Sequence, residues 1–329
     1  MKRIAINGMG RIGRTSLKLI FETPNLEVIA VNDIASIENI AYLLKHDSVH
    51  GSFEKDISIE GYQLIIDGKK IAFLSERDPE QLPWKKLKID IVIESTGVFT
   101  RQEDADKHIT AGAKTVVLSG PSKSRNIPTV VHGVNTQDGN TSIFSCASCT
   151  TNNISPVMEI IGRRIGIKKA IMTTIHADTA SNRTIDSTNE KDFRMGRSGL
   201  NNLIPTSTGA AIATTLAMPQ FEGKFDGLAV RVPLAVGSLS DITIVTDRKT
   251  SAEEINQILA EEAGTDRYLK VFAVTNEPIV SSDIIKSPYA AIADLEMTKV
   301  VDGDLVKILA WYDNEWGFTS QMIRQIQVV

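Results

Sequence analysis

Gly8-Met-Gly-Arg-Ile-Gly13 is the stretch of this sequence that decides the fold of its first half. A short apolar segment before it predicts a buried strand, and residues 11–21 predict a helix directly after it. A second strand, predicted over 27–31, is followed by Asp33, which stands 20 residues after Gly13. A strand, a glycine turn, a helix, a strand and an acid in this order are typical of a doubly wound dinucleotide-binding fold. In that fold the glycines let the backbone approach a pyrophosphate, whose charge the helix N-terminus favours.

Asp33 indicates which dinucleotide the fold would bind. A carboxylate here accepts hydrogen bonds from both ribose hydroxyls and repels a 2′-phosphate, so it favours NAD over NADP. Two further predicted strands, 89–94 and 115–118, end shortly before Thr96 and Ser119. Because parallel strands end at the same edge of a sheet, we expect both residues beside Asp33. Without the glycine turn, both would be interpreted as ordinary residues of turns.

Both cysteines of the chain lie in Ser145-Cys-Ala-Ser-Cys-Thr-Thr-Asn-Asn153, where a helix is predicted over 150–165. A thiol at the first turn of a helix faces unpaired N–H groups and the positive end of the helix dipole, which stabilise a thiolate. The hydroxyls of Thr150 and Thr151 are expected to cap that turn. We interpret Cys149 as a nucleophile and Cys146 as a small buried hydrophobic residue.

The second half of the chain offers further polar residues whose roles depend on their surroundings. His176 follows a strand predicted over 168–174 and, taken alone, is more often a structural histidine. The polar stretch 178–202 is either a functional loop or a solvated basic one. Residues 205–210 are predicted to open a helix that suits an anion. Arg231 lies in an apolar run, and we expect it to face an anion because arginine is seldom buried unpaired.

Two domains are predicted for this length of 329 residues. The first, over 1–148, is an α/β domain with a Rossmann-type doubly wound parallel sheet. We expect the C-terminal helix within 315–329 to complete it. The second, over 149–314, is an α+β catalytic domain with a mostly antiparallel sheet.

The composition excludes several other classes of protein. Hydrophobic residues at 42% and charged residues at 23% are ordinary for a globular protein, and the net charge of −4 gives no reason to expect nucleic acid. Two cysteines do not make a disulfide framework and fit a reducing compartment. No apolar run approaches the roughly 18–20 residues of a membrane span, and no signal peptide is apparent. A cytoplasmic protein is therefore expected.

Several motifs along essentially the whole chain resemble those of the phosphorylating glyceraldehyde-3-phosphate dehydrogenase family. Together and in this order they are specific to that family. They are Ile6-Asn-Gly-Met-Gly-Arg-Ile-Gly-Arg14, Leu44-Lys-His-Asp-Ser-Val-His-Gly51, Glu94-Ser-Thr-Gly-Val-Phe-Thr100, Ala147-Ser-Cys-Thr-Thr-Asn152, Thr173-Thr-Ile-His-Ala177, Ile204-Pro-Thr-Ser-Thr-Gly-Ala-Ala211, Arg231-Val-Pro233 and Trp311-Tyr-Asp-Asn-Glu-Trp-Gly317.

The resemblance implies a role for each matching residue. Cys149 would be the nucleophile and His176 its base, and no metal is expected. Thr179 and Arg231 would hold the phosphate of the substrate. The attacking inorganic phosphate would contact Ser148, Thr150, Thr208 and Gly209, with Arg197 nearby. The cofactor would contact Gly8, Gly10, Arg11, Ile12, Gly13, Asp33, Arg77, Thr96, Ser119 and Asn314. From the residues alone, Arg77 is as easily a solvated arginine of a polar loop. Family members are usually homotetramers in which the 178–202 loop packs against a neighbour.

The implied reaction oxidises glyceraldehyde 3-phosphate to 1,3-bisphosphoglycerate with NAD through a hemithioacetal and a thioester on Cys149. We expect His176 and the helix end to lower the pKa of Cys149, to roughly 3.5–7.5. Two enzyme alternatives remain, the same chemistry on another phosphorylated aldehyde such as erythrose 4-phosphate, and an NADP-preferring biosynthetic form. A thiol hydrolase and a non-catalytic binding protein fit less well, since neither uses the glycine turn together with Cys149.

The sequence departs from the family pattern at a few positions that bear on these expectations. Asp178 stands where the family usually has Tyr, and Ser181 where it often has Asp or Thr, so the contacts around Thr179 are expected to differ. Ser187 and Thr188 replace a common Leu-Pro, and we expect NAD to be preferred with some tolerance of NADP. Cys146 replaces an Asn, and mild oxidation is expected to join it to Cys149.

Overall fold

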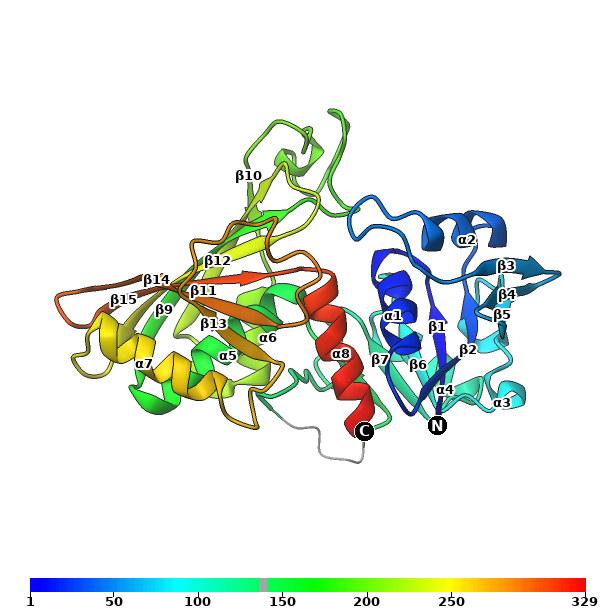
Figure 1. The fold of residues 1–329 in the computed structure, drawn as a ribbon, viewed down its shortest axis with the longest axis horizontal. Coiled ribbons are helices and arrows are strands. Elements are labelled where there is room, and N and C mark those ends of the chain that lie inside the picture. The colour runs from blue at the N-terminus through cyan, green and yellow to red at the C-terminus, as the bar shows by residue number, and fades with distance from the viewer. Residues whose placement is uncertain (136–140) are drawn as a thin grey trace. The chain divides into compact units, whose positions relative to one another are not determined.

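A computed structural model describes residues 1–135 and 141–329, which divide into two compact units (Figure 1). The first unit is formed by Met1–Val130, the segment that ends at Ala147 and Met322–Val329. The second unit is formed by Ser148–Gln321 and a short segment that starts at Val131. In the described part of the chain, no helix has both the length and the apolar character that crossing a membrane requires.

The first unit is built on an eight-stranded sheet with the order β3-β4-β5-β2-β1-β6-β7-β8. From β5 to β8 all neighbours are parallel, and β3 and β4 extend the sheet as an antiparallel pair. The predicted doubly wound parallel sheet is therefore confirmed. The strands are β1 (Lys2–Asn7), β2 (Leu26–Asn32), β3 (Ile57–Glu60), β4 (Gln63–Ile66), β5 (Lys69–Leu74), β6 (Ile91–Glu94), β7 (Thr115–Leu118) and β8 (Ile143–Ser145).

Helices follow the parallel strands of this unit and cover the sheet. They are α1 (Arg11–Phe21), α2 (Ile37–Lys45), α3 (Trp84–Leu87) and α4 (Gln102–Thr110). Strand β1 is buried along Ile4–Asn7, as expected for a central parallel strand covered on both faces. Ser36 caps α2 by accepting a hydrogen bond from the N–H of Asn39. The buried core thus holds the carboxyl ends of β1, β2 and β6 at one edge of the sheet.

The second unit contains a seven-stranded mixed sheet with the order β10-β11-β9-β12-β15-β14-β13. Four of its neighbouring pairs are antiparallel and two are parallel, which confirms the predicted mostly antiparallel sheet. The strands are β9 (Ile167–Ala177), β10 (Ile204–Ser207), β11 (Phe225–Val232), β12 (Ser238–Thr246), β13 (Phe272–Thr275), β14 (Ala291–Val301) and β15 (Leu305–Tyr312).

One hydrophobic core joins this sheet to helices α5 (Cys149–Arg164) and α7 (Ala252–Ala263). Helix α6 (Ala210–Ala217) adds Ala210 and Ala211 to the same core. Helix α8 (Trp316–Val328) ends the chain, and its last residues belong to the first unit. There the Lys2 Nζ donates to the carbonyl oxygens of Ile326 at 2.9 Å and Gln327 at 3.0 Å.

Three predicted elements differ from those observed. Strand β9 extends to Ala177, so His176 lies inside the strand, because β11 pairs with it along its whole second half. The segment predicted to open a helix at 205 instead forms β10 against β11, and α6 begins only at Ala210. Helix α8 begins at Trp316, inside the predicted range 315–329 but one residue after its start, since the Asp313 carboxylate accepts the N–H groups of Glu315 and Trp316.

Candidate active site

The first turn of α5 places Cys149 at the start of a helix. The N-cap of this helix is Ser148, whose Oγ accepts a hydrogen bond from the N–H of Thr151 at 3.1 Å. The prediction that Thr150 and Thr151 cap the turn is therefore wrong, because Ser148 stands one residue before the helix in the extended conformation of an N-cap. Cys149, as the first helical residue, lies against N–H groups that no earlier turn satisfies.

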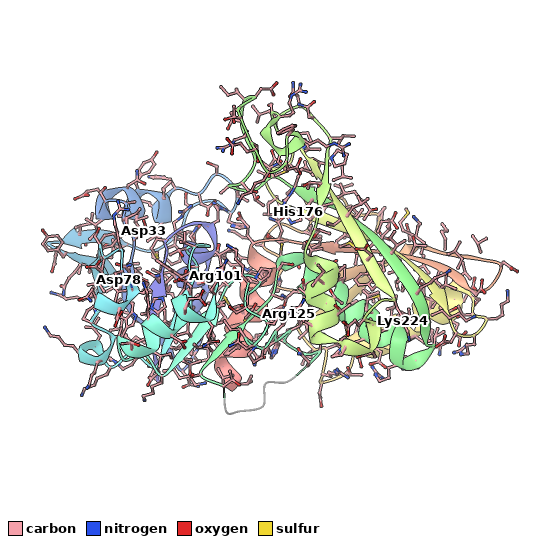
Figure 2. All side chains as sticks on the ribbon, turned by 180° about the vertical axis from the view of Figure 1, so that it is seen from behind. Asp33, Asp78, Arg101, Arg125, His176 and Lys224 are labelled. Atoms are coloured by element: carbon pink, nitrogen blue, oxygen red, sulfur yellow. The ribbon has the colours of Figure 1, made fainter. Side chains whose placement is uncertain are left out.

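His176 comes to Cys149 from strand β9 in the sheet of the second unit. It lies on β9, is 4% exposed, and places its Nε2 3.4 Å from the Sγ of Cys149. Figure 2 labels His176 on this strand. The two residues are 27 positions apart in the sequence, and the chain between them includes the rest of α5 and most of β9, so the fold brings them together.

Two neighbours of His176 determine what its ring can do. Its Nδ1 lies 2.6 Å from the carbonyl oxygen of Ala177, which can only accept a hydrogen bond, whereas the guanidinium of Arg231 beside the same Nδ1 can only donate one, so the two contacts favour opposite tautomers. The Nη1 of Arg231 lies 2.6 Å from the same Nδ1 and 3.0 Å from the same carbonyl. Arg231 therefore holds a full positive charge against the edge of the imidazole.

Burial sets the ionisation of this pair. Burial, and then the charge of Arg231, lowers the pKa of His176 to about 4. Burial raises the pKa of the Cys149 thiol, and the opposing effects of Arg231 and of nearby hydrogen bonds are smaller. The predicted lowering of the Cys149 pKa is therefore wrong, because desolvation outweighs the helix end and His176 carries no charge to help it. With the two pKa values shifted in these directions, the thiol and the imidazole are both neutral near pH 7.

A buried tyrosine that the sequence analysis did not single out supports this pair. The hydroxyl of Tyr312 lies 2.9 Å from the Oγ1 of Thr150 and 2.8 Å from the Oγ1 of Thr174, and its ring meets that of His176 edge-on. It therefore ties β15 to the start of α5 and to β9. Its position inside the Trp311–Gly317 motif was the signal that could have identified it.

Arg231 also faces the turn after β9, where polar atoms are left without partners. Thr179 Oγ1 lies 2.9 Å from the hydroxyl of Ser181, and the Thr179 N–H donates to the Oδ1 of Asn182. The Nδ2 of Asn182 and the Nε of Arg231 are buried and have no hydrogen-bond partner among the described residues. Two buried donors without acceptors suit an anion. Asn182 was missed because nothing in its sequence context distinguishes it from a loop residue.

The first turns of α5 and α6 form a second group of potential anion contacts. The Oγ1 of Thr151 reaches the carbonyl oxygen of Ala210 at 3.5 Å, which brings the two helix starts together. Thr208 Oγ1 accepts the N–H of Ala210, and the missing Cβ of Gly209 would meet nothing within 4 Å. Ser148, Thr208 and Gly209 are thus brought together, whereas the buried hydroxyl of Thr150 is engaged by Tyr312.

Arg197 lies apart from these groups in the exposed loop before β10. Its Nε pairs with the Oδ2 of Asp186 at 2.9 Å, and both side chains are more than half exposed. The structure therefore does not bring Arg197 to Ser148 or Thr208, and its part in binding phosphate stays a prediction.

In the first unit, a cavity of about 400 Å³ lies at the carboxyl ends of β1, β2 and β6. The residues that line it include Gly8, Gly10, Asp33, Arg77 and Thr96. Figure 2 labels Asp33 in this unit. The predicted cofactor residues Arg11, Ile12, Gly13 and Ser119 are not among the lining residues that the structure describes.

The three glycines of the turn differ in what an added Cβ would meet. Gly8 has a φ of +94° and passes so close to the β6 turn that a Cβ would lie 2.7 Å from the nitrogen of Thr96. A Cβ on Gly13 would lie 1.9 Å from the carbonyl oxygen of Gly8. Gly10 is different, because a Cβ there would meet nothing within 4 Å and would point into open space at the helix start. These features fit a pyrophosphate laid against the first turn of α1.

Asp33 is held rigidly at the mouth of this cavity. Its Oδ2 accepts the N–H of Met9 at 2.7 Å and its Oδ1 accepts the N–H of Ala35 at 2.8 Å. Each oxygen keeps a further lone pair for a ribose hydroxyl. The guanidinium of Arg11 pairs with Asp47 at 2.8 Å. Arg11 would therefore contact an anion through its backbone N–H at the start of α1.

A buried network under the cavity was also missed. Glu94, at the end of β6, accepts hydrogen bonds from Asn7 Nδ2 at 2.6 Å and from the N–H of Thr96 at 2.8 Å. His108 Nε2 lies 3.1 Å from Glu94 and its Nδ1 accepts from the indole of Trp84, which places the imidazole proton on Nε2. The network fixes Thr96 and Asn7 beneath the site.

Asn314 belongs to the second unit and is fixed by one end. Its Oδ1 accepts from the N–H of Gly237 at 3.2 Å and from the hydroxyl of Ser238 at 3.0 Å. This orientation leaves its Nδ2 as the group that would act as a donor to a ligand. Among the described residues no group of His, Cys, Asp and Glu side chains is arranged to hold a metal ion.

Comparisons with known proteins match nearly the whole chain. The family model described as "Glyceraldehyde 3-phosphate dehydrogenase, NAD binding domain" matches residues 2–102, and that of the "C-terminal domain" matches residues 148–314. The chain is 45% identical to the glyceraldehyde-3-phosphate dehydrogenase of Zymomonas mobilis, over 98% of this chain and 96% of that protein. It is 42% identical to the enzyme of the same name from Clostridium pasteurianum, over 99% and 98% of the two chains. It is 43% identical to that of Thermotoga maritima, over 100% and 99%.

Proposed function

Because the chain belongs to the glyceraldehyde-3-phosphate dehydrogenase family, we propose that it oxidises glyceraldehyde 3-phosphate with NAD and inorganic phosphate to 1,3-bisphosphoglycerate. The observation that carries this proposal is the pair formed by Cys149 Sγ and His176 Nε2, 3.4 Å apart at the first residue of α5. A thiol within hydrogen-bonding distance of an imidazole nitrogen is the arrangement of an activated nucleophile.

In the first step the sulfur of Cys149 attacks the aldehyde carbon, and its proton passes to Nε2 of His176. The resulting hemithioacetal oxygen would be stabilised by the protonated Nε2 and by the free N–H groups at the start of α5. Arg231 opposes protonation of His176 through its charge. A substrate phosphate bound to Arg231 would offset that charge, so the correct substrate would itself make His176 a stronger base.

NAD, when bound, supplies the oxidant by accepting a hydride from the substrate carbon. The acyl group then remains on Cys149 as a thioester, which keeps the energy of the oxidation. Inorganic phosphate attacks this thioester, the carbon–sulfur bond breaks, and the leaving sulfur recovers a proton from His176. The acyl phosphate product then leaves the enzyme.

The two groups of polar residues in the second unit would divide the two phosphates between them. Arg231 and Thr179, with the unpartnered Nδ2 of Asn182, would hold the phosphate of the substrate. Ser148, Thr208 and Gly209 would hold the attacking phosphate at the paired starts of α5 and α6. Thr150 would act mainly through Tyr312, which positions the first turn of α5.

The first unit would hold the cofactor through its cavity and the first turn of α1. Gly10, with Arg11, Ile12 and Gly13 behind it, would present the backbone to the pyrophosphate, and Asp33 would bind the adenosine ribose. Arg77 and Thr96 would contact the adenine side. Ser119 and Asn314 are proposed for the nicotinamide side from the family resemblance alone.

We further propose a cytoplasmic homotetramer as the working form. This proposal is supported by the family and by exposed apolar side chains in and after the 178–202 loop, among them Phe193 at 82% and Leu203 at 71% exposure.

An assay of cofactor reduction with glyceraldehyde 3-phosphate, with and without inorganic phosphate, tests the proposed reaction. We expect sustained reduction of NAD only when phosphate is present, and less with NADP or with erythrose 4-phosphate. An equal rate of NAD reduction with and without phosphate, or faster turnover of erythrose 4-phosphate than of glyceraldehyde 3-phosphate, would overturn the assignment.

Substitution of Cys149 tests the nucleophile in the same assay. Cys149→Ser should lower kcat at least about 10³-fold, because a hydroxyl is a far weaker nucleophile than a thiol at neutral pH. Cys146→Ala is the matched control, since Cys146 is 3% exposed and has no role in the proposed reaction. Turnover by the Cys149→Ser variant near the parent rate would rule out the covalent mechanism.

A further inference from the structure

Asp178 carries a buried oxygen atom that the proposed mechanism does not use. Its backbone N–H donates to the carbonyl of Leu234 at 2.9 Å, but its Oδ1 is buried and has no hydrogen-bond partner among the described residues. The side chain packs on Gly199, where a Cβ would lie only 2.1 Å from Oδ2. Buried carboxyl oxygens almost always accept hydrogen bonds, so this one needs a physical explanation.

The charge near Asp178 is that of Arg231. Burial raises the pKa of the Asp178 carboxyl, and the guanidinium of Arg231 on β11 acts against burial without overcoming it. Gly199, which packs on the side chain, carries no charge. His176, whose ring also lies against the guanidinium of Arg231, is neutral near pH 7 because its own pKa is lowered to about 4.

Asp178 thus lies in the group of residues assigned above to the substrate phosphate. It directly precedes Thr179, and it competes for the positive charge of Arg231. An ionised Asp178 offers a phosphate no donor and repels it, whereas a protonated Asp178 offers an O–H group. The ligand's affinity must therefore depend on whether this carboxyl holds a proton.

We propose that Asp178 makes binding of the substrate's phosphate dependent on pH, because its carboxyl takes up a proton when that phosphate binds to Arg231. The inference rests on the proposed function, in which Arg231 and Thr179 hold that phosphate. A bound phosphate draws the charge of Arg231 away from Asp178 and adds a negative charge beside it, and both effects favour the protonated carboxyl. By linkage, phosphate-bearing ligands bind more tightly as the pH falls toward the raised pKa of Asp178.

Calorimetric binding of glycerol 3-phosphate measures this coupling without any turnover. The probe carries the phosphate and no aldehyde, and titrations in buffers of different ionisation enthalpy, from about pH 5 to pH 8, count the protons taken up. The parent should take up more protons than Asp178→Asn in the lower part of this range. Near pH 8, where the carboxylate is ionised, Asp178→Asn should bind the probe about fivefold more tightly.

Asp226→Asn is the matched control, because it makes the same change of charge at an exposed position of β11, five residues before Arg231. It should match the parent in both proton count and affinity. Equal proton counts and equal affinities for the parent and Asp178→Asn would overturn the inference. If Asp178→Asn does not fold, Asp178→Ser removes the same carboxyl with a smaller side chain.

Steady-state kinetics separate failure of this inference from failure of the proposed function. Asp178→Asn should raise the ratio of kcat/KM for glyceraldehyde 3-phosphate over unphosphorylated glyceraldehyde several-fold, through the KM of the phosphorylated substrate. A parent enzyme that reduces NAD with glyceraldehyde 3-phosphate, together with an unchanged ratio in the variant, refutes the role of Asp178 alone. A parent that does not oxidise the phosphorylated aldehyde refutes the proposed function, whatever the calorimetry shows.

Discussion

The proposed role of His176 as a base is opposed by surroundings that disfavour its protonated form. In the proposed reaction His176 accepts a proton from Cys149, yet it is 4% exposed and lies 2.6 Å from a guanidinium nitrogen. Both surroundings disfavour the imidazolium, so the resting pair is neutral and the charged pair forms only as the thiol attacks. Under the proposed mechanism the site would therefore withhold a reactive thiolate until a substrate engages Arg231, which would limit side reactions of the sulfur.

This lowered pKa predicts a specific dependence of stability on pH. The imidazole has a pKa of about 4 in the folded chain against the ordinary value of 6.5, so the unfolded chain binds more protons between these values. The contribution of His176 to the free energy of unfolding should therefore be complete above pH 6.5. It should be lost as the pH drops toward 4, which lowers the free energy of unfolding by about 3 kcal/mol. Urea unfolding at several pH values measures the fall.

Comparison of two variants isolates the histidine in that experiment. His176→Asn should lose most of this part of the pH dependence, whereas His46→Asn, at an exposed position, should keep it. An identical slope in the parent and in His176→Asn would show that His176 is not buried in the neutral form.

The sequence could identify the pair but not its ionisation. Cys149 and His176 stand in motifs whose spacing predicted a nucleophile and a base, and the fold places them in contact. The direction of their pKa shifts depends on burial and on Arg231, and both come from the packing of distant parts of the chain. The predicted disulfide between Cys146 and Cys149 stays untested, and burial, which raises the pKa of Cys146, argues against easy oxidation.

At the scale of an element, the turn from β1 to α1 combines folding and binding in three glycines. Gly8 and Gly13 serve the fold, because each would drive a Cβ into backbone atoms of the turn or of β6. Gly10 serves the ligand, because space beside it is open and its φ of −68° suits any residue. The same residue type thus has two separable roles within six positions.

Alanine substitutions should separate these roles. Gly10→Ala should fold with the parent's stability, since its Cβ meets nothing, but should weaken NAD binding at least about tenfold by occupying the approach to α1. Gly13→Ala should destabilise the first unit, because its Cβ would lie 1.9 Å from the Gly8 oxygen. Thermal unfolding and fluorescence titration with NAD distinguish the two. Parent-like NAD affinity in Gly10→Ala would mean that the pyrophosphate does not lie there.

Elements were predictable where local signals define both ends. The predicted bounds of α1 and β7 match those observed, since a glycine turn or a change of polarity borders each. The ends of β9 and β10 were not predictable, because both are set by pairing with β11, which lies at least 18 residues further along the chain. Helix α5 starts one residue earlier than predicted, since Ser148 and not Thr150 caps it.

At the scale of the whole molecule, each unit has its own sheet and its own core, but neither is one continuous stretch of chain. The last residues of α8 belong to the first unit, where Lys2 holds the carbonyl end of the helix. Alternating strands and helices predicted the first sheet. The position of β9 between β11 and β12 in the second sheet has no local signal, although it is what brings His176 to Arg231.

Exposed apolar side chains of the second unit predict how copies of the chain associate. Ile185, Phe193, Leu200 and Leu203 are each at least 64% exposed, and all lie in or just after the polar loop before β10. Monomeric proteins rarely leave so many large apolar side chains in water within one segment, so we expect this loop to be covered by another copy. Light scattering after size exclusion should therefore give the mass of four chains for the parent.

Charge placed in that loop should dissociate the assembly. The double variant Phe193→Asp with Leu203→Asp would bury carboxylates in the interface, so its mass should fall below that of the parent. Tyr62 and Tyr42 in the first unit are 83% and 62% exposed, and the corresponding double Asp variant is the control. A parent that runs as a single chain, or equal dissociation of both variants, would place the association elsewhere. Dissociation of the loop variant alone would assign the interface to this loop.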